Sequence, residues 1–119
     1  MTDSDAQTNS EQANAEQAGT DEIVVVHAPE RHRYELRDGD AVIGFTNYRP
    51  GRASNQLVFD HTVVNPGYEG RGLAARLVKF TLDEVTGAGT RIVPLCPYIA
   101  AYLRRHHDYD DWIDWPEAA

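Results

Sequence analysis

A glycine-rich turn between a strand-like run and a helical pattern is the part of this sequence best suited to chemistry. The apolar run 57–64 leads into Asn65-Pro66-Gly67-Tyr68-Glu69-Gly70-Arg71-Gly72-Leu73-Ala74, and an amphipathic helical pattern continues to Val85. Glycine lets a backbone approach a ligand closely, and the first turn of a helix leaves N–H groups unpaired at the positive end of its dipole. Such a turn can hold a phosphate or pyrophosphate. Ordinary strand-to-helix loops also use glycine, so the turn alone does not separate a binding site from a plain connection.

Residues of the strand end and the turn are the candidate binding residues. Backbone N–H groups from Glu69 to Ala74 would contact the anion, and Arg71 and Arg76 would add positive charge. The full candidate set is Val63, Val64, Glu69, Gly70, Arg71, Gly72, Leu73, Ala74 and Arg76.

Four antiparallel strands are expected to precede and position the turn. Runs of β-branched or alternating residues favour these strands, and Asp38-Gly39-Asp40 favours a hairpin between the second and the third. The runs are 23–27, 33–37, 41–48 and 56–64.

The chain after the turn predicts a helix, a fifth strand and a second helix. The first helix should end at Thr86-Gly87-Ala88-Gly89, with Gly87 as the left-handed cap. The strand 91–96 should run parallel to the fourth strand. Pro94 cannot donate a ladder hydrogen bond, so this strand should lie at an edge or separate locally from its neighbour. Pro97 suits the first position of the second helix.

Charge is unevenly distributed along the 119 residues, whose formal net charge is −8. Residues 1–22 contain six acidic and no basic residues, and we expect a disordered acidic tail there, before a folded domain over 23–119. Residues 23–107 contain eleven basic and eight acidic residues. This mildly basic body suits an anionic ligand, although a solvated arginine-rich surface is the commoner explanation.

The same composition bears on partners and location. No long basic stripe or aromatic RNA-binding signature is present in the sequence, so we expect no nucleic acid partner. The sequence shows no secretory signal and no segment long enough to span a bilayer, so we expect a cytoplasmic protein without a membrane partner.

Several motifs in register resemble the GNAT acetyltransferase superfamily. The turn is similar to its coenzyme A motif, Gln/Arg-x-x-Gly-x-Gly/Ala, with Gly72 and Ala74 at the last two fixed positions. Glu69 stands where Gln or Arg is usual, and its carboxylate would repel a pyrophosphate unless turned outward. A closer likeness is to the small, cysteine-containing branch of the superfamily, over about Glu30 to Trp112. The motifs that carry it are 61–64, 70–74 and Val93-Pro94-Leu95-Cys96-Pro97-Tyr98.

This resemblance implies an α/β (α+β) fold: a GNAT-like mixed sheet of about five strands, four antiparallel and one parallel to the fourth, with two main helices. It also implies that the fourth and fifth strands splay apart around the pantetheine arm of acetyl-coenzyme A, the expected co-substrate. The chain departs from the family pattern at its front, which has no room for the helices that form much of the acceptor site.

The implied reaction is attack of an amine on a thioester, which needs a base for the amine, stabilisation of an oxyanion and a proton for the departing thiolate. His61 is the candidate base, because an imidazole has an ordinary pKa of about 6.5; a structural histidine beside Asp60 is the alternative. The resemblance places the tyrosine that protonates the thiolate at Tyr102, with Tyr98 as the substitute. A core tyrosine is the other interpretation of Tyr102.

Cys96 is the third catalytic candidate. It is the only cysteine in the sequence, so no intramolecular disulfide can form. Its position before a helix start would favour the thiolate. It could be a buried packing residue, a wall of the thioester pocket able to form a mixed disulfide with coenzyme A, or an acyl-carrying nucleophile. The histidines lack a recognised metal-ligand spacing, and we expect no metal site.

The sequence therefore predicts an acetyl-coenzyme A-dependent N-acetyltransferase that acts on a small amine or a protein amine. A non-catalytic coenzyme A-binding or protein-interaction module with the same fold is the alternative, and a purely structural domain with an empty turn is a third hypothesis.

Overall fold

One twisted sheet of five strands organises residues 23–116, the part of the chain that the structure, a computed structural model, describes. The predicted acidic tail, residues 1–22, lies outside the described residues. The elements are β1 (Ile23–Ala28), η2 (Pro29–Arg31), β2 (Arg33–Asp38), β3 (Ala41–Pro50), β4 (Gln56–Val64), α1 (Leu73–Gly87), β5 (Arg91–Pro94), α2 (Pro97–Arg105) and η3 (His107–Trp112).

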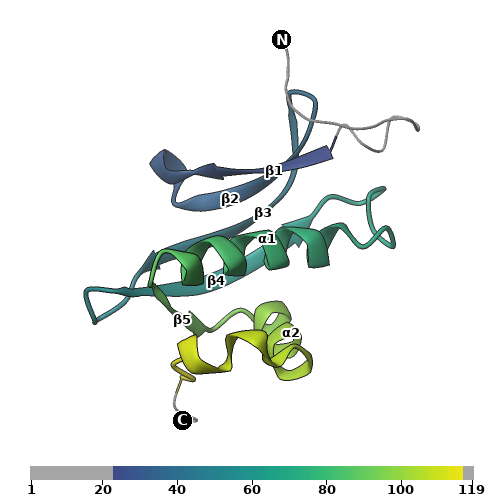
Figure 1. The fold of residues 1–119 in the computed structure, drawn as a ribbon. Coiled ribbons are helices and arrows are strands. Elements are labelled where there is room, and N and C mark those ends of the chain that lie inside the picture. The colour runs from purple at the N-terminus through teal and green to yellow at the C-terminus, as the bar shows by residue number, and fades with distance from the viewer. Residues whose placement is uncertain (1–22, 117–119) are drawn as a thin grey trace.

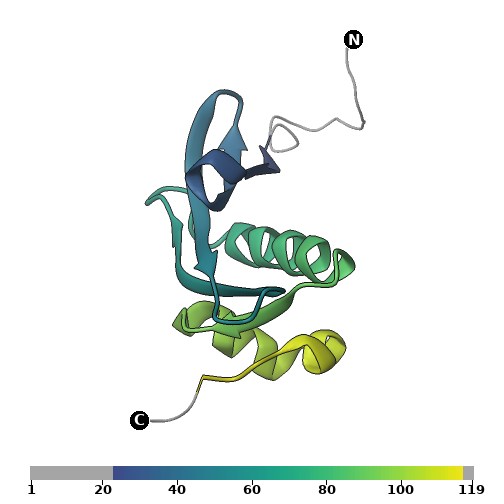
Figure 2. The same cartoon turned by 90° about the vertical axis from the view of Figure 1, so that its left-hand side faces the viewer.

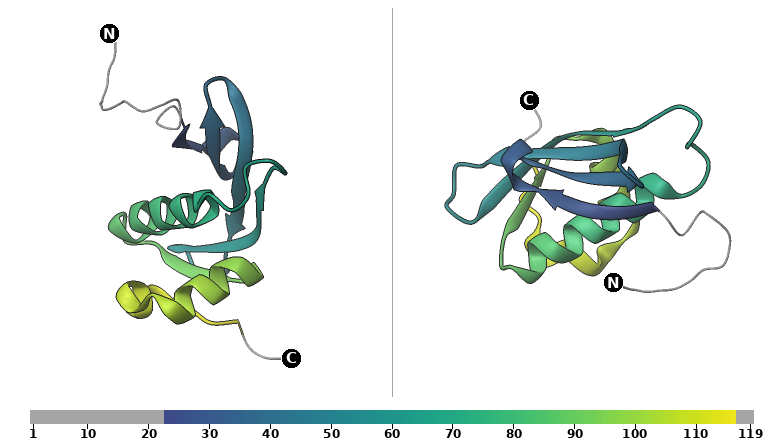
Figure 3. Two further views of the ribbon diagram at one scale, coloured as in Figure 1. Left: turned by 90° about the vertical axis from the view of Figure 1, so that its right-hand side faces the viewer. Right: turned by 90° about the horizontal axis from the view of Figure 1, so that it is seen from above.

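The strands lie in the sheet in chain order. The pairs β1–β2, β2–β3 and β3–β4 are antiparallel, whereas β4 and β5 are parallel. This confirms the predicted α/β class with four antiparallel strands and one strand parallel to the fourth. In Figure 1, α1 crosses in front of the strands, and Figure 2 shows the sheet curling around this helix. Helix α2 and η3 lie beyond β5, away from β1 (Figure 3).

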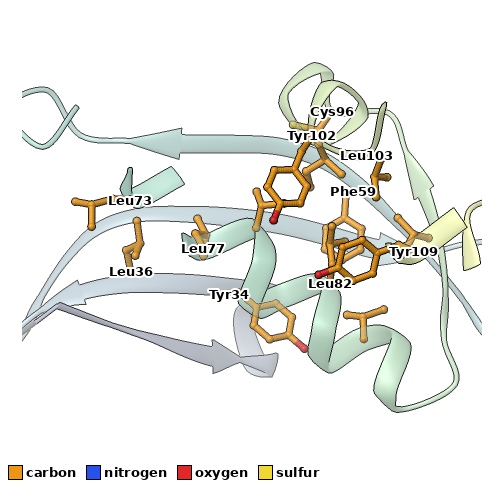
Figure 4. Close-up of a cluster of buried hydrophobic side chains, with 14 of the residues drawn as sticks. Tyr34, Leu36, Phe59, Leu73, Leu77, Leu82, Cys96, Tyr102, Leu103 and Tyr109 are labelled. Atoms are coloured by element: carbon orange, nitrogen blue, oxygen red, sulfur yellow. The ribbon is translucent and has the colours of Figure 1, made fainter. Parts of the chain in front are cut away.

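The hydrophobic core lies between the concave side of the sheet and the helices. The side chains that α1 buries recur every three or four residues, as its amphipathic sequence predicts; they are Leu73, Leu77, Val78, Thr81, Leu82 and Val85. Phe59 of β4 is fully buried among them, and Tyr102 and Leu103 bring α2 into the same cluster (Figure 4). The shared core fixes both helices relative to β4.

The end of α1 differs from the prediction. Gly87 is the last helical residue, and the left-handed glycine is Gly89, with φ of 81°. The Gly89 N–H donates to Thr86 O at 2.9 Å and the Thr90 N–H donates to Val85 O at 3.1 Å, the paired bonds of a Schellman motif. The expectation of a cap at Gly87 was wrong because the helix continues through that residue and the positive φ falls on the second glycine.

The strands β4 and β5 part where the sequence predicts a separation. Their pairing runs from Gln56–Arg91 to Phe59–Pro94. Pro94 has no N–H with which to continue the ladder, so β5 ends there, two residues earlier than expected. Strand β4 continues to Val64 and stays paired with β3. Its last residues therefore border a gap on the β5 side.

A bulge in β4 lies next to the point where β4 and β5 part. Asn47 of β3 pairs with His61, but the next residue, Tyr48, pairs with Phe59, so Asp60 is an extra residue in β4. A bulge of this kind shifts the alternation of side chains by one position.

The shift decides which side chains face the core on either side of the bulge. Phe59 belongs to the core cluster, and Val64 also packs against that cluster although its number is even. Val58 before the bulge and His61 after it point to the opposite face of the sheet by alternation.

Between β1 and β2 the described chain forms η2, a single turn of three residues, which fits the expected absence of long helices there. Within residues 23–116, no helix has the length and apolar character needed to cross a membrane.

Candidate functional site

A cleft of about 350 Å³ opens between the glycine turn, the end of β4 and the start of α2. It lies on the core side of the sheet, where β4 and β5 have parted. Its lining residues come from these three places: Thr62, Val64, Tyr68, Glu69, Gly70, Gly72, Leu73, Ala74, Ala75 and Tyr98. The turn that the sequence singled out therefore faces an open cleft.

Glycine is required in the turn by its backbone geometry. Gly67, Gly70 and Gly72 have φ of 95°, 79° and 72°, in the left-handed region that other residues adopt at a cost. A Cβ built on Gly70 or Gly72 would meet no atom within 4 Å. The positive φ, and not crowding, selects glycine, and the space above the backbone is open to a ligand.

The start of α1 presents unpaired amides to this space. The first bond of the helix runs from Arg76 N to Gly72 O at 3.1 Å, so the N–H groups of Leu73, Ala74 and Ala75 have no partner within the helix. No side chain of the described residues caps this end. The positive end of the helix dipole adds to the attraction of these amides for an anion.

The arginines expected to add charge do not line the cleft. The Arg71 guanidinium lies over the Tyr68 ring, 5.4 Å from its centroid, and the Tyr68 hydroxyl donates to Asp38 Oδ2 at 2.9 Å. Arg76 Nη2 donates to Ile23 O at 2.9 Å, which ties α1 to the start of β1. At the turn itself, the backbone amides and not these arginines thus supply the donors for an anion.

Two further members of the predicted binding set have contrasting positions. Glu69, which stands where the family motif has Gln or Arg, lines the cleft and is exposed. Val63 lies between the two cleft-lining residues Thr62 and Val64, points to the opposite face and is 42% exposed. Leu73 and Ala74, also in the predicted binding set, line the cleft.

His61 lies on the face of the sheet opposite the cleft. Its side chain is exposed, and its backbone N–H donates to Asn47 Oδ1 at 2.9 Å. It follows the bulged Asp60 directly, at the level where β4 and β5 part. The imidazole is therefore beside the gap, but on the side away from the glycine turn.

Of the two candidate tyrosines, Tyr98 lines the cleft and Tyr102 does not. Tyr98, in the first turn of α2, is 36% exposed. Tyr102 is buried in the core and stacks on His106 with ring centroids 4.1 Å apart. Burial raises the pKa of the Tyr102 hydroxyl above its ordinary value, although the charge of Lys79 acts in the opposite direction. One helical turn separates a residue at the cleft from a residue of the core.

Cys96 is buried behind the cleft wall. Its Sγ–H donates to Thr62 Oγ1 at 3.3 Å, and Thr62 Oγ1 lies 3.0 Å from the hydroxyl of the fully buried Thr46. Thr62, a cleft residue that sequence reasoning missed, separates the thiol from the opening. The bulge at Asp60 hides Thr62 from a simple alternation of β4, because it moves the inward positions from odd to even numbers.

Within residues 23–116, no three His, Cys, Asp or Glu side chains gather in a way that could hold a metal ion.

The chemistry that the cleft can support is the binding of an anion at the turn and of an extended arm along the free edge of β4. Unpaired strand edges offer both N–H and C=O groups to such an arm.

Comparisons with known proteins agree with this geometry. A GCN5-like protein from Staphylococcus aureus, solved by NMR, has the same fold with a TM-score of 0.61, at 18% identity over 81% of this chain and 92% of that one. The GNAT family N-acetyltransferase YhbS from Escherichia coli, in complex with CoA, has a TM-score of 0.51, at 28% identity over 64% of this chain and 48% of that one. A comparison with curated proteins gives no match. Residues 33–112, from β2 to η3, match the model of the GCN5-related N-acetyl-transferases, and the chain belongs to this family.

Proposed function

We propose that this protein is an acetyl-coenzyme A-dependent N-acetyltransferase that transfers the acetyl group to an amine by direct attack. The observation that carries the proposal is the cleft in which the free amides of the α1 start meet the gap between β4 and β5. The CoA complex of YhbS, which shares the family fold, supports the same class of ligand here.

The two ends of the cleft bind different parts of acetyl-coenzyme A. The amides of Leu73, Ala74 and Ala75, with the left-handed Gly70 and Gly72 beside them, hold the diphosphate. The edge of β4 beyond Phe59 offers backbone groups to the amides of the pantetheine arm, in the manner of an added strand. This arrangement directs the arm towards the point where the strands part.

Acetyl-coenzyme A supplies the thioester: the amine nitrogen bonds to the acetyl carbon, the carbon–sulfur bond breaks, and coenzyme A leaves as a thiolate. His61, beside the gap on the opposite face, accepts the proton of the incoming amine. Tyr98, at the cleft, gives a proton to the thiolate and takes the role that the family resemblance assigned to Tyr102. Cys96 takes no covalent part, because its buried thiol lies behind Thr62.

A calorimetric titration with acetyl-coenzyme A, followed by steady-state thiol release with a panel of amines, tests the proposal. We expect saturable binding and amine-dependent thiol release. Absence of binding would remove the site assignment.

The second candidate function is a non-catalytic module that binds coenzyme A or a protein. Two observations favour it: the carboxylate of Glu69 lines the cleft, and only the short η2 stands between β1 and β2. Binding without thiol release for any amine in the panel would select this function.

A further inference from the structure

A second and larger cleft, of about 740 Å³, lies on the opposite face of the sheet, behind the paired residues of β4 and β5. Its apolar floor is made by Val58, Val93 and Leu95, which alternate with the core-facing side chains of the same segments. Trp115, 44% exposed, forms one wall.

This second cleft ends at the gap between the strands. Val58 and Val93 are the residues just before the last pair, Phe59 and Pro94, and Leu95 follows that pair. Arg49, which also lines the cleft, donates from Nε to Asp60 Oδ2 at 3.1 Å and so reaches the bulge beside His61. A molecule in the second cleft can therefore place one end at the gap into which the first cleft opens from the other side.

The second cleft has a balanced charge at its side and an added positive charge at the end away from the gap. At its side, Asp114 is held by Arg91, whose Nη2 lies 2.8 Å from Asp114 Oδ1, and by Gln56 Nε2 at 2.9 Å, so its charge is balanced within the protein. At the end away from the gap, the exposed Arg52 of the β3–β4 loop adds a positive charge. From Gln56 to Asp60, β4 rises about 3.3 Å per residue, so the ends are about 13 Å apart.

We propose that the second cleft is the acceptor site and that it selects amines carrying an anionic group at the far end of an apolar chain. The anionic group contacts Arg52, the chain lies over Val58 and against Trp115, and the amine reaches the gap beside His61. This rests on the proposed function and adds the substrate class to it: an ω-aminocarboxylate fits, whereas a diamine of equal length places a second cation against Arg52.

The experiment compares 6-aminohexanoate, hexylamine and 1,6-diaminohexane as acceptors in the thiol-release assay with the full chain. We expect the highest kcat/KM for 6-aminohexanoate and the lowest for the diamine. In Arg52→Glu, kcat/KM for 6-aminohexanoate should fall about tenfold and the preference should turn towards the diamine. The control Arg105→Glu, the same charge change in the last turn of α2 and outside this cleft, should keep the original order.

A second readout does not depend on turnover. We expect 6-aminohexanoate to shift the indole N–H resonance of Trp115 in wild type and not in Arg52→Glu, with an unchanged Kd for acetyl-coenzyme A in both. Turnover with the same order of acceptors in wild type and Arg52→Glu would overturn the acceptor assignment while leaving the transferase intact. A Trp115 shift without thiol release for any amine would keep the binding site and remove the enzyme proposal. If 6-aminohexanoate does not shift the Trp115 resonance in wild type, the inference is overturned.

Discussion

The backbone N–H of Cys96 donates to Phe59 O at 2.8 Å, and this bond joins β4 to the segment between β5 and α2 where the two strands part. Pro94, the partner of Phe59 in the ladder, has no N–H of its own. The chain after β5 therefore turns into α2 and leaves the edge of β4 open from Asp60 to Val64. The first cleft borders this open edge on the core side of the sheet, and the second cleft reaches Val58, Val93 and Leu95 beside it on the opposite face.

Gly72 is the position at which charge at the helix start can be tested without a change of shape. Aspartate and asparagine have nearly the same size and both tolerate a positive φ better than other side chains. Like charges about 5 Å apart repel by about 3 kcal/mol near a protein surface, so Gly72→Asp should bind acetyl-coenzyme A about a hundredfold more weakly than Gly72→Asn by calorimetry.

Gly89→Asp is the control for this pair, because Gly89 also has a positive φ, of 81°, but lies at the other end of α1. It should be destabilised without loss of affinity. Equal affinities of Gly72→Asp and Gly72→Asn would show that the helix start does not hold the diphosphate.

Glu69 places a carboxylate in the cleft and should weaken the binding of an anion. Removal of this charge in Glu69→Gln should improve the affinity for acetyl-coenzyme A by about 0.5–1 kcal/mol, roughly two- to fivefold, since the residue is exposed. The gain should shrink in about 1 M salt, where charges are screened within about 3 Å. Calorimetry at low and high salt measures both effects; a loss of affinity in Glu69→Gln would mean that the carboxylate accepts a useful hydrogen bond instead.

Tyr98 and Tyr102 form a matched pair on α2, one turn apart. If Tyr98 protonates the thiolate, Tyr98→Phe should lower kcat by about a hundredfold, the usual size of a general-acid contribution. Tyr102→Phe should leave kcat within about twofold and change mainly the melting temperature, because its ring lies in the core. Steady-state thiol release measures both variants. The opposite ranking would return the role to Tyr102.

Cys96→Ala separates a covalent from a structural role of the thiol. Direct attack needs no acyl-enzyme, so kcat should stay within about threefold. Loss of a buried side chain and of its hydrogen bond to Thr62 should cost about 1–2 kcal/mol of stability. Kinetics and denaturant unfolding give the two values. A complete loss of turnover in a folded Cys96→Ala protein would establish the nucleophile that the sequence left open.

Glu35 is a fully buried carboxylate on β2, held by three arginines. Arg37 Nη2 lies 2.7 Å from Oε1, and Arg33 Nε lies 2.7 Å and Arg31 Nη1 3.2 Å from Oε2. Burial alone would raise the pKa of Glu35, but the hydrogen bonds and charges of Arg37 and Arg33 outweigh it and lower the pKa below 4.5. The stability that Glu35 contributes should be fully present above pH 4.5 and be lost as the pH falls through the lowered pKa.

Glu35→Gln should therefore lower the free energy of unfolding at pH 7 by about 2–3 kcal/mol and flatten its decline in acid. Lys79→Gln, which breaks the exposed pair of Lys79 with Asp83, should lower the free energy of unfolding much less than Glu35→Gln does, because solvent screens this pair. Urea unfolding between pH 3 and pH 7 gives both results. A Glu35→Gln protein as stable as wild type at pH 7 would show that the cluster is neutral for stability.

The order of strands, the turn and the start of α2 could be predicted because each depends on neighbours in the sequence. Alternation and the Asp38-Gly39-Asp40 turn predicted the hairpin, and Pro94 predicted the separation of β5 from β4, although β5 ends two residues earlier than expected. The helix cap at Gly89 was missed, since Gly87 and Gly89 suit a cap equally well until the packing of α1 fixes its length.

By itself, the sequence determined the strand, the glycine turn and the helix that follows it, because these elements follow from local residue type and spacing. The tertiary structure decided which side chains face the cleft: the bulge at Asp60 reversed the alternation of β4 and brought Thr62 inward, and the docking of α2 chose Tyr98 over Tyr102. Periodicity shows which residues share a face, but only the packing of one element on another shows what that face meets.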